Sequence, residues 1–379
     1  MHKKEWLEKI ERQGRDLKNK IKHSPRLLKK KKGFLWASFL GWGLVVFALV
    51  LGVWLQKYFS FQPKPSQVSK PEPEAIVLER ASLLKVGFVT DWEYADKIRL
   101  KQKITSEAPI ELRKVVSYFN TTFLPDVVVG GGDYIESSNA KAERARRQLA
   151  EMNAIFSKVT APRLYAFGDH DFRSLTQEEI KSVLGLAETH DWKDIGDWRI
   201  ITIDPNYDRD DNHRNAKPYV FGHMSPAEMD WLRGALQTER PALVFSHYNL
   251  IPVPNSKGAY IYNVDNADAV RTLLEEAGNV VAVVSGHNPM GYYEKRNGIH
   301  YFVVDTLVNR KAMGSFATIE ARYIREQNYA HIFLRQYGAY KVQYAVDGKI
   351  GKSDTHLITS PPFALQLSDE VTEAELMDQ

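Results

Sequence analysis

Residues 165–172 read YAFGDHDF, an apolar run that reaches Gly168 and continues directly into Asp169, His170 and Asp171. An apolar run of this length is typical of a buried β-strand. Two carboxylates and an imidazole are costly to remove from water unless a cation or a reaction uses them. The stretch therefore predicts a functional site at the end of a strand, and the nature of that site depends on which other residues meet it.

The segments on both sides of this stretch alternate between strand-like and helix-like patterns. Apolar, β-rich runs lie at 83–90, 126–131, 163–168, 198–204, 241–247, 279–287 and 299–307. Helical patterns lie at 110–119, 140–156, 225–236 and 267–278, and further strands are expected within 328–348. Apolar strands separated by helices predict a layered α/β fold in which the sheet is buried between helices.

Five of the expected strands end in side chains of the types that bind metal ions. They are Asp91 and Glu93, Asp133, Asp169 and His170, His247, and His287. Ligands in layered α/β folds bind at the carboxyl ends of strands, and an extended backbone would place Asp91 and Glu93 on one face. Each of these residues alone is usual in a turn or a helix cap. Together, in a chain without cysteine, they predict a metal site made of carboxylate and imidazole ligands.

The order of these motifs resembles the calcineurin-like metallophosphoesterase superfamily. The family pattern is D-x-H, G-D, G-N-H-[DE], a lone H and G-H-x-H. This chain has D-W-E at 91–93, G-D at 132–133, G-D-H-D at 168–171, His247 and G-H-N-P at 286–289. The segments GDYIES, NADAVRTLLEEAGNVVAVVSGH and NGIHYF are most similar to the branch of manganese-dependent ADP-ribose/CDP-alcohol diphosphatases.

The resemblance implies a four-layer α/β/β/α sandwich that hydrolyses a phosphoester or diphosphate bond with a dinuclear-metal-activated hydroxide. Six side chains would hold two divalent ions: Asp91 and Glu93 the first, Asp169, His247 and His287 the second, and Asp133 both. His170 would bind no metal and would protonate the leaving oxygen. Asp171 would orient His170.

Three positions depart from the family pattern: Asp169 replaces an asparagine, Glu93 a histidine, and Pro289 the last histidine. Proline offers no side-chain ligand, so the first site is expected to be the weaker, with water completing its shell. We expect manganese, with magnesium, iron or zinc as alternatives. The competing interpretation is a catalytically impaired domain that acts as a binding or scaffold module.

The N-terminal region differs from the rest of the chain in charge. Residues 1–33 hold 13 Lys or Arg and four Asp or Glu, a net charge of +9, whereas the remainder holds 38 and 43, a net charge of −5. Residues 34–55 are uncharged and as a helix would span roughly 33 Å, enough for a bilayer. The positive-inside rule predicts a signal anchor with a cytoplasmic N-terminus and an extracytoplasmic hydrolase domain. The mildly acidic body argues against nucleic-acid binding.

Five parts are therefore expected along the chain. They are a basic arm (1–33), a transmembrane helix (34–55), a proline-rich linker (56–80), the metallophosphoesterase domain (81–350) and a C-terminal extension with an acidic tail (351–379). The expected substrate is a phosphorylated small molecule, a nucleotide or a lipid.

Overall fold

The computed structural model describes residues 82–96, 102–138, 140–215, 221–253, 262–289, 291–311, 313–339 and 341–351, and the backbone of 363–365. All of them belong to the second of two units of the chain, Pro73–Gln379. Within these ranges, every helix is too short or too polar to cross a membrane. The predicted transmembrane helix at 34–55, the arm before it and the linker after it lie outside the described residues.

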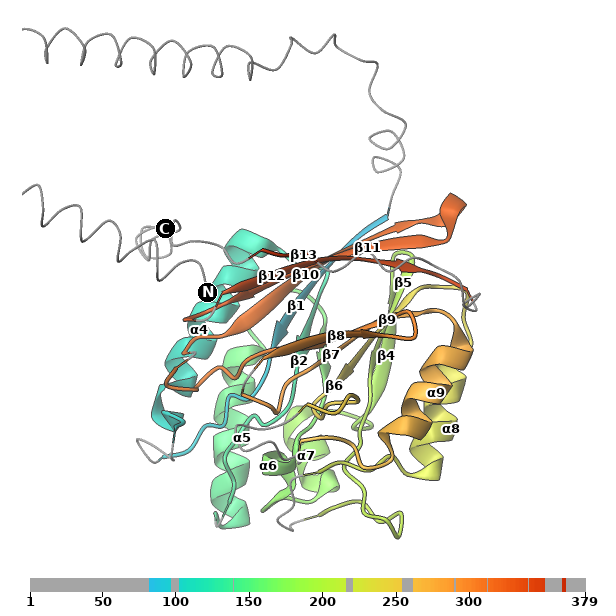
Figure 1. Ribbon diagram of the computed structural model, residues 1–379. Coiled ribbons are helices and arrows are strands. Elements are labelled where there is room, and N and C mark those ends of the chain that lie inside the picture. The colour runs from blue at the N-terminus through green and yellow to red at the C-terminus, as the bar shows by residue number, and fades with distance from the viewer. Residues whose placement is uncertain are drawn as a thin grey trace, which may run out of the picture. The chain divides into compact units, whose positions relative to one another are not determined.

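Two β-sheets form the centre of the described body (Figure 1). In spatial order, the first contains β13 (Phe363–Leu365), β12 (Val342–Lys349), β11 (Tyr329–Tyr337), β10 (Phe316–Ile324), β1 (Ser82–Val89), β2 (Val127–Gly130) and β3 (Arg163–Tyr165). Strands β1, β2 and β3 are parallel, and β10 joins β1 in the antiparallel direction. The carboxyl ends of these three parallel strands therefore lie side by side at the same end of the sheet.

The second sheet contains β4 (Asp191–Ile195), β5 (Trp198–Thr202), β6 (Ala242–Ser246), β7 (Val280–Ser285), β9 (Ile299–Val303) and β8 (Tyr292–Arg296), in that spatial order. Its four central strands are parallel, and β4 and β8 run antiparallel at the two edges. The carboxyl ends of its four parallel strands likewise lie side by side at one end of the sheet.

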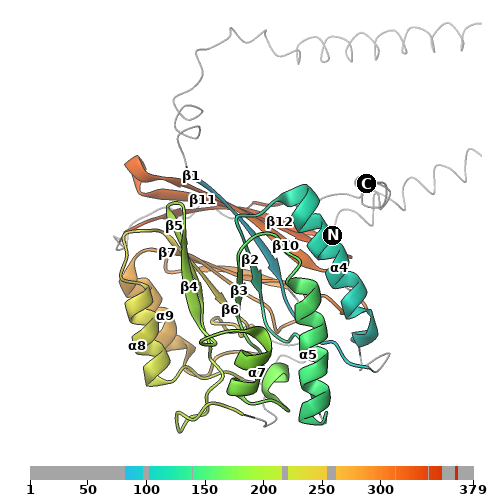
Figure 2. The same ribbon diagram turned by 180° about the vertical axis from the view of Figure 1, so that it is seen from behind.

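Helices cover the outer side of each sheet, as the two opposite views in Figures 1 and 2 show. On the first sheet lie α4 (Ala108–Tyr118), its π-helical continuation (Phe119–Phe123), α5 (Ala142–Phe156) and α7 (Gln177–Leu184). On the second lie α8 (Pro226–Ala235) and α9 (Ala267–Ala277), and short helices occur at α6 (Asp169–Phe172), Thr105–Glu107 and Arg325–Gln327. The four predicted helices correspond to α4, α5, α8 and α9.

The alternation of side chains along the strands separates the layers of the core. Phe88 of β1 and Phe245 of β6 both lie in the cluster between the sheets, with ring centroids 5.5 Å apart. Their neighbours Val89 and Val244 point the opposite way, into the cluster beneath the helices. The described body is therefore a mixed α/β fold in which two sheets pack face to face with helices outside, as the sequence predicts.

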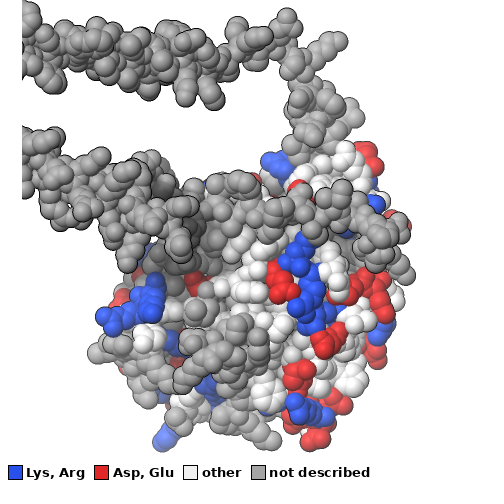
Figure 3. Space-filling view, in the orientation of Figure 1, with Lys and Arg blue, Asp and Glu red and all other residues white. Residues whose placement is uncertain are grey.

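Charges of both signs share the surface of the described body. On the face shown in Figure 3, basic and acidic side chains lie next to one another. Ion pairs occur within the described body, for example between Arg296 and Glu294 at 2.8 Å. This mixture is consistent with the small net charge that the sequence gives the body.

Candidate metal centre

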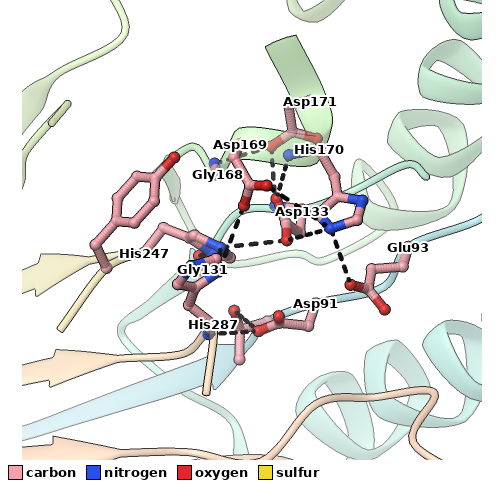
Figure 4. A network of polar contacts seen from close by, with 12 residues as sticks. Asp91, Glu93, Gly131, Asp133, Gly168, Asp169, His170, Asp171, His247 and His287 are labelled. Carbon is pink, nitrogen blue, oxygen red and sulfur yellow. Dashed lines mark hydrogen bonds and ion pairs between the residues drawn. The ribbon is translucent and has the colours of Figure 1, made fainter. Parts of the chain in front are cut away.

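The carboxyl ends of parallel strands from both sheets bring the predicted ligands together (Figure 4). Asp91 follows β1, Asp133 follows β2, Asp169 begins α6 after β3, His247 follows β6, and His287 follows β7. All five side chains are buried. Figure 4 shows Asp133 in the middle of the group, with Asp91 on the side of His287.

Four of these residues could hold one metal ion. Ligand atoms of Asp133, Asp169, His247 and His287 all lie within 4.8 Å of one another. Nε2 of His247 lies 2.9 Å from Nδ1 of His287 and 3.3 Å from Oδ2 of Asp133. Nδ1 of His287 lies 3.4 Å from Oδ1 of Asp169. Two carboxylates and two imidazoles form a donor set that suits a divalent transition metal.

The surroundings of these four side chains also fit a cation. Nδ1 of His247 donates to the carbonyl oxygen of Gly131 at 2.8 Å, which leaves Nε2 for a metal. Oδ1 of Asp169 is buried and has no hydrogen-bond partner within the described ranges. A Cβ atom on Gly168 would lie 2.5 Å from Nε2 of His247, so this glycine keeps the space between the ligands open.

Mutual electrostatics hold this group together without an ion. Burial alone would raise the pKa of Asp133, but His247 and His170 outweigh it and hold that pKa well below its usual range. Burial alone would lower the pKa of His247, but Asp133 outweighs it and raises that pKa to about 10. Metal binding requires the neutral imidazole, so an ion would compete with a proton for His247.

The backbone is left-handed at four of the predicted ligands. The φ angles are 53° at Asp91, 43° at Glu93, 53° at Asp133 and 64° at His287. Such backbone costs about 1–3 kcal/mol per residue outside glycine and concentrates at functional sites. The N–H of Asp91 donates to the carbonyl oxygen of Gly132 at 2.9 Å, and that of Glu93 to Asp133 at 2.7 Å, so backbone pairing stabilises the turn.

This turn corrects the expectation that an extended backbone places Asp91 and Glu93 on one face. Oδ2 of Asp91 accepts hydrogen bonds from Thr90 Oγ1 at 2.7 Å and from the backbone N–H of His287 at 3.0 Å. Oε1 of Glu93 instead forms an ion pair with Lys103 and lies 3.9 Å from Nε2 of His170. The two carboxylates therefore turn towards different partners.

His170 lies beside the ligand group and is held by an acid that the sequence analysis did not single out. Its Nδ1 lies 2.6 Å from Oε2 of Glu136, and its Nε2 lies 4.0 Å from Oδ2 of Asp133. Burial alone would lower the pKa of His170, but the carboxylates around it, Asp133 foremost, raise it to about 9. His170 is therefore protonated at neutral pH, as a general acid must be.

The orienting contact expected from Asp171 is made by Glu136 instead. The carboxylate of Asp171 accepts three backbone N–H groups, those of Asp133 at 2.8 Å, Tyr134 at 2.7 Å and Gly168 at 3.1 Å. Asp171 therefore ties the loop after β2 to the loop after β3. Its part in the site is to fix the positions of Asp133 and Gly168.

Three further residues contact the site: Lys103, Glu136 and Arg173. Glu136 lies in the GDYIES segment, so a signal for it was present in the sequence. Arg173 pairs with Oδ2 of Asp169, four residues before it, which is a helical spacing. Lys103 belongs to no motif, and no local pattern in the sequence relates it to Glu93, ten residues before it.

Comparison with known proteins supports the fold. No family model and no curated protein matches this chain. Among solved structures it is similar to a dimetal phosphatase from Danio rerio, with a TM-score of 0.56 and 15% identity over 71% of this chain and 99% of that one. It is also similar to GAP50 of Plasmodium, described as the anchor in the inner membrane complex, with a TM-score of 0.48 and 12% identity over 72% and 90% of the two chains. The first likeness shows that the described body shares the fold of this dimetal phosphatase.

Proposed function

We propose that this chain is a metal-dependent phosphoesterase that hydrolyses a phosphoester or diphosphate bond. The observation that carries the proposal is the convergence of two buried carboxylates and two buried imidazoles within 4.8 Å. These ligands come from loops of both sheets, in a fold shared with a dimetal phosphatase. Fold alone does not determine function, so the proposal depends on this donor set.

The residues around the centre have separate parts in the proposed reaction. Asp133, Asp169, His247 and His287 hold the divalent ion. When bound, the ion supplies Lewis acidity towards a phosphoryl oxygen and assists the formation of the nucleophile from water. His170 delivers a proton to the leaving oxygen, and Glu136, 2.6 Å from its Nδ1, keeps the ring charged and oriented.

The identity of the metal and of the substrate belongs to the same proposal. The mixed oxygen and nitrogen ligands suit Mn²⁺ first, with Mg²⁺, Fe²⁺ and Zn²⁺ as alternatives. Among phosphorylated small molecules, nucleotides and lipids, we place ADP-ribose and CDP-alcohols first, because the sequence segments around the site are most similar to that branch.

Hydrolysis of bis-p-nitrophenyl phosphate by the purified full chain, with and without Mn²⁺, tests the proposal. We expect Mn²⁺-dependent turnover that falls about 100-fold or more in Asp133→Asn and in His170→Ala, the loss usual for a ligand or a general acid. Asp210→Asn, on the exposed surface, is the control and should retain turnover. If the wild type shows no turnover with Mn²⁺, Mg²⁺, Fe²⁺ or Zn²⁺, the result would instead favour a binding or scaffold module.

We also propose that residues 34–55 anchor the chain in a membrane with the hydrolase body outside the cytoplasm. The support is the uncharged run and the basic arm that precedes it. Because the chain has no cysteine, single substitutions can be labelled with a membrane-impermeant maleimide in intact cells. Asp210→Cys should be labelled and Glu5→Cys should be protected, and the reverse pattern would contradict this topology.

A further inference from the structure

The ammonium group of Lys103 contacts one of the residues predicted to hold the first metal ion. Its Nζ pairs with Oε1 of Glu93, whose side chain is 1% exposed. Glu93 is one of the three acids expected to hold the first metal ion, with Asp91 and Asp133. A buried carboxylate requires a cation or hydrogen bonds to offset its desolvation, and Lys103 already provides that cation.

The ligands expected for a first metal ion are otherwise engaged or missing. Oδ2 of Asp91 accepts two hydrogen bonds, from Thr90 and from the backbone of His287. Pro289, which takes the place of the last histidine of the motif, has no donor atom. Oε2 of Glu93 is buried without a hydrogen-bond partner within the described ranges, but Oε1 of the same carboxylate already holds the Lys103 ammonium. With no ligand from position 289, the residues around this position do not offer a complete shell for a second ion.

The second acidic substitution is compensated in the same way. Asp169 replaces a neutral asparagine of the family pattern, and Arg173 pairs with its Oδ2. Oδ1 of Asp169 stays without a hydrogen-bond partner within the described ranges, so it remains available to an ion. Each acid that replaces a neutral ligand type has thus gained a cationic partner. Asp169 still belongs to a group of four converging ligands, whereas the set that includes Glu93 lacks a ligand at position 289.

We propose that the ammonium of Lys103 takes the place of the first metal ion, so that the centre holds one divalent ion and Lys103 supplies the second positive charge to a substrate phosphate. A lysine ammonium acts on phosphate as a point charge and can serve this role. This inference rests on the proposed phosphoesterase function. It assigns to Lys103 a specific effect on metal stoichiometry and on anion affinity.

The number of ions bound by the full chain is the first test. Isothermal titration with Mn²⁺ and elemental analysis should give one ion per chain, and electron paramagnetic resonance should show an isolated Mn²⁺ ion. Two ions of similar affinity with an exchange-coupled spectrum would overturn the inference. A centre completed by Glu93, Asp133 and His170, whose ligand atoms also lie within 4.8 Å of one another, would give that result.

The affinity of inorganic phosphate for the chain loaded with one Mn²⁺ ion is the second test. Lys103→Gln should weaken phosphate binding about tenfold or more, the effect of losing a hydrogen bond to a charged group. Lys103→Arg keeps the charge and should retain most of the affinity. Lys114→Gln makes the same change on a side chain that is 62% exposed and should leave it unchanged. Unchanged phosphate affinity in Lys103→Gln at one bound ion would overturn the inference.

The outcomes separate this inference from the function on which it rests. If the wild type binds two ions and turns over, the phosphoesterase function stands and the role of Lys103 falls. If the chain binds no ion and no phosphate, both fall. If Lys103→Gln takes up a second ion that the wild type excludes, the inference is supported, because the vacated position then accepts a cation.

Discussion

Substitution of Gly168 by alanine should remove metal binding while the fold is retained. The φ and ψ angles of Gly168 are −112° and 177°, which any residue adopts without strain. Its added methyl carbon, however, would lie 2.1 Å from Oδ1 of Asp133 and 2.5 Å from Nε2 of His247, so it would meet two of the ligands. Ordinary carbon contacts lie at about 3.5–4.0 Å, so the ring must move by roughly 1 Å.

A ligand moved by roughly 1 Å falls far outside the tolerance of about 0.2 Å for metal–ligand distances. We expect Gly168→Ala to weaken Mn²⁺ binding at least about 100-fold, which is about 3 kcal/mol of binding free energy. The overpacking should cost about 1–3 kcal/mol of stability. Isothermal titration measures the first quantity and urea unfolding the second.

The matched control for this substitution is Gly234→Ala. Gly234 lies within α8, and nothing lies within 4 Å of a Cβ placed there. This change should raise the free energy of unfolding by about 0.5–1 kcal/mol, because alanine favours a helix over glycine, and should leave Mn²⁺ affinity unchanged. Wild-type Mn²⁺ affinity in Gly168→Ala would refute the placement of the ion between these ligands.

Three further predictions concern protons. Glu136→Gln removes the carboxylate from His170 and so lowers its pKa; we expect the alkaline limb of the pH profile of kcat to move to lower pH, with about a tenfold loss at pH 9. Burial lowers the pKa of His300 to about 4. As the pH falls, this side chain therefore binds a proton in the unfolded chain before it does so in the folded chain. Urea unfolding should show about 3 kcal/mol of stability lost as pH falls from 6.5 to 4, and His300→Gln should lack this slope. Because His247 holds a proton at neutral pH, Mn²⁺ affinity should fall about tenfold per unit of acidification, and calorimetry in buffers of different ionisation enthalpy should detect the released proton.

The elements that the sequence predicts are those whose apolar pattern is strong. The parallel strands β2, β6 and β7 are buried along their whole length and read as nearly continuous apolar runs. The strands β1, β5 and β9 are mostly apolar, with one basic residue or histidine each. The edge strands β4 (DWKDI) and β8 (YYEKR) are polar and partly exposed, so no such run marks them. Strand β10, which pairs with β1, has no uninterrupted apolar run either, because Glu320 and Arg322 lie among its apolar residues.

The residues of the candidate site likewise fall into those that the sequence predicts and those that it does not. The acids and imidazoles at strand ends could be predicted, because their residue types and their positions after apolar runs are local features. Their partners could not be predicted, because Lys103 lies ten residues from Glu93 in the chain and no local pattern relates the two. The left-handed turn at Asp91 and Glu93 likewise depends on pairing with the loop after β2.

The four ligands of the candidate centre come in equal numbers from the two sheets. Asp133 and Asp169 follow strands of the first, and His247 and His287 follow strands of the second. An ion bound by all four would therefore link loops of the two sheets across the boundary between them. Two of these loops, those of Asp133 and His247, lie more than a hundred residues apart in the chain. Removal of the ion by a chelator should then speed amide hydrogen exchange at the strand ends that face this boundary. The amide groups of the outer helices should keep their protection from exchange.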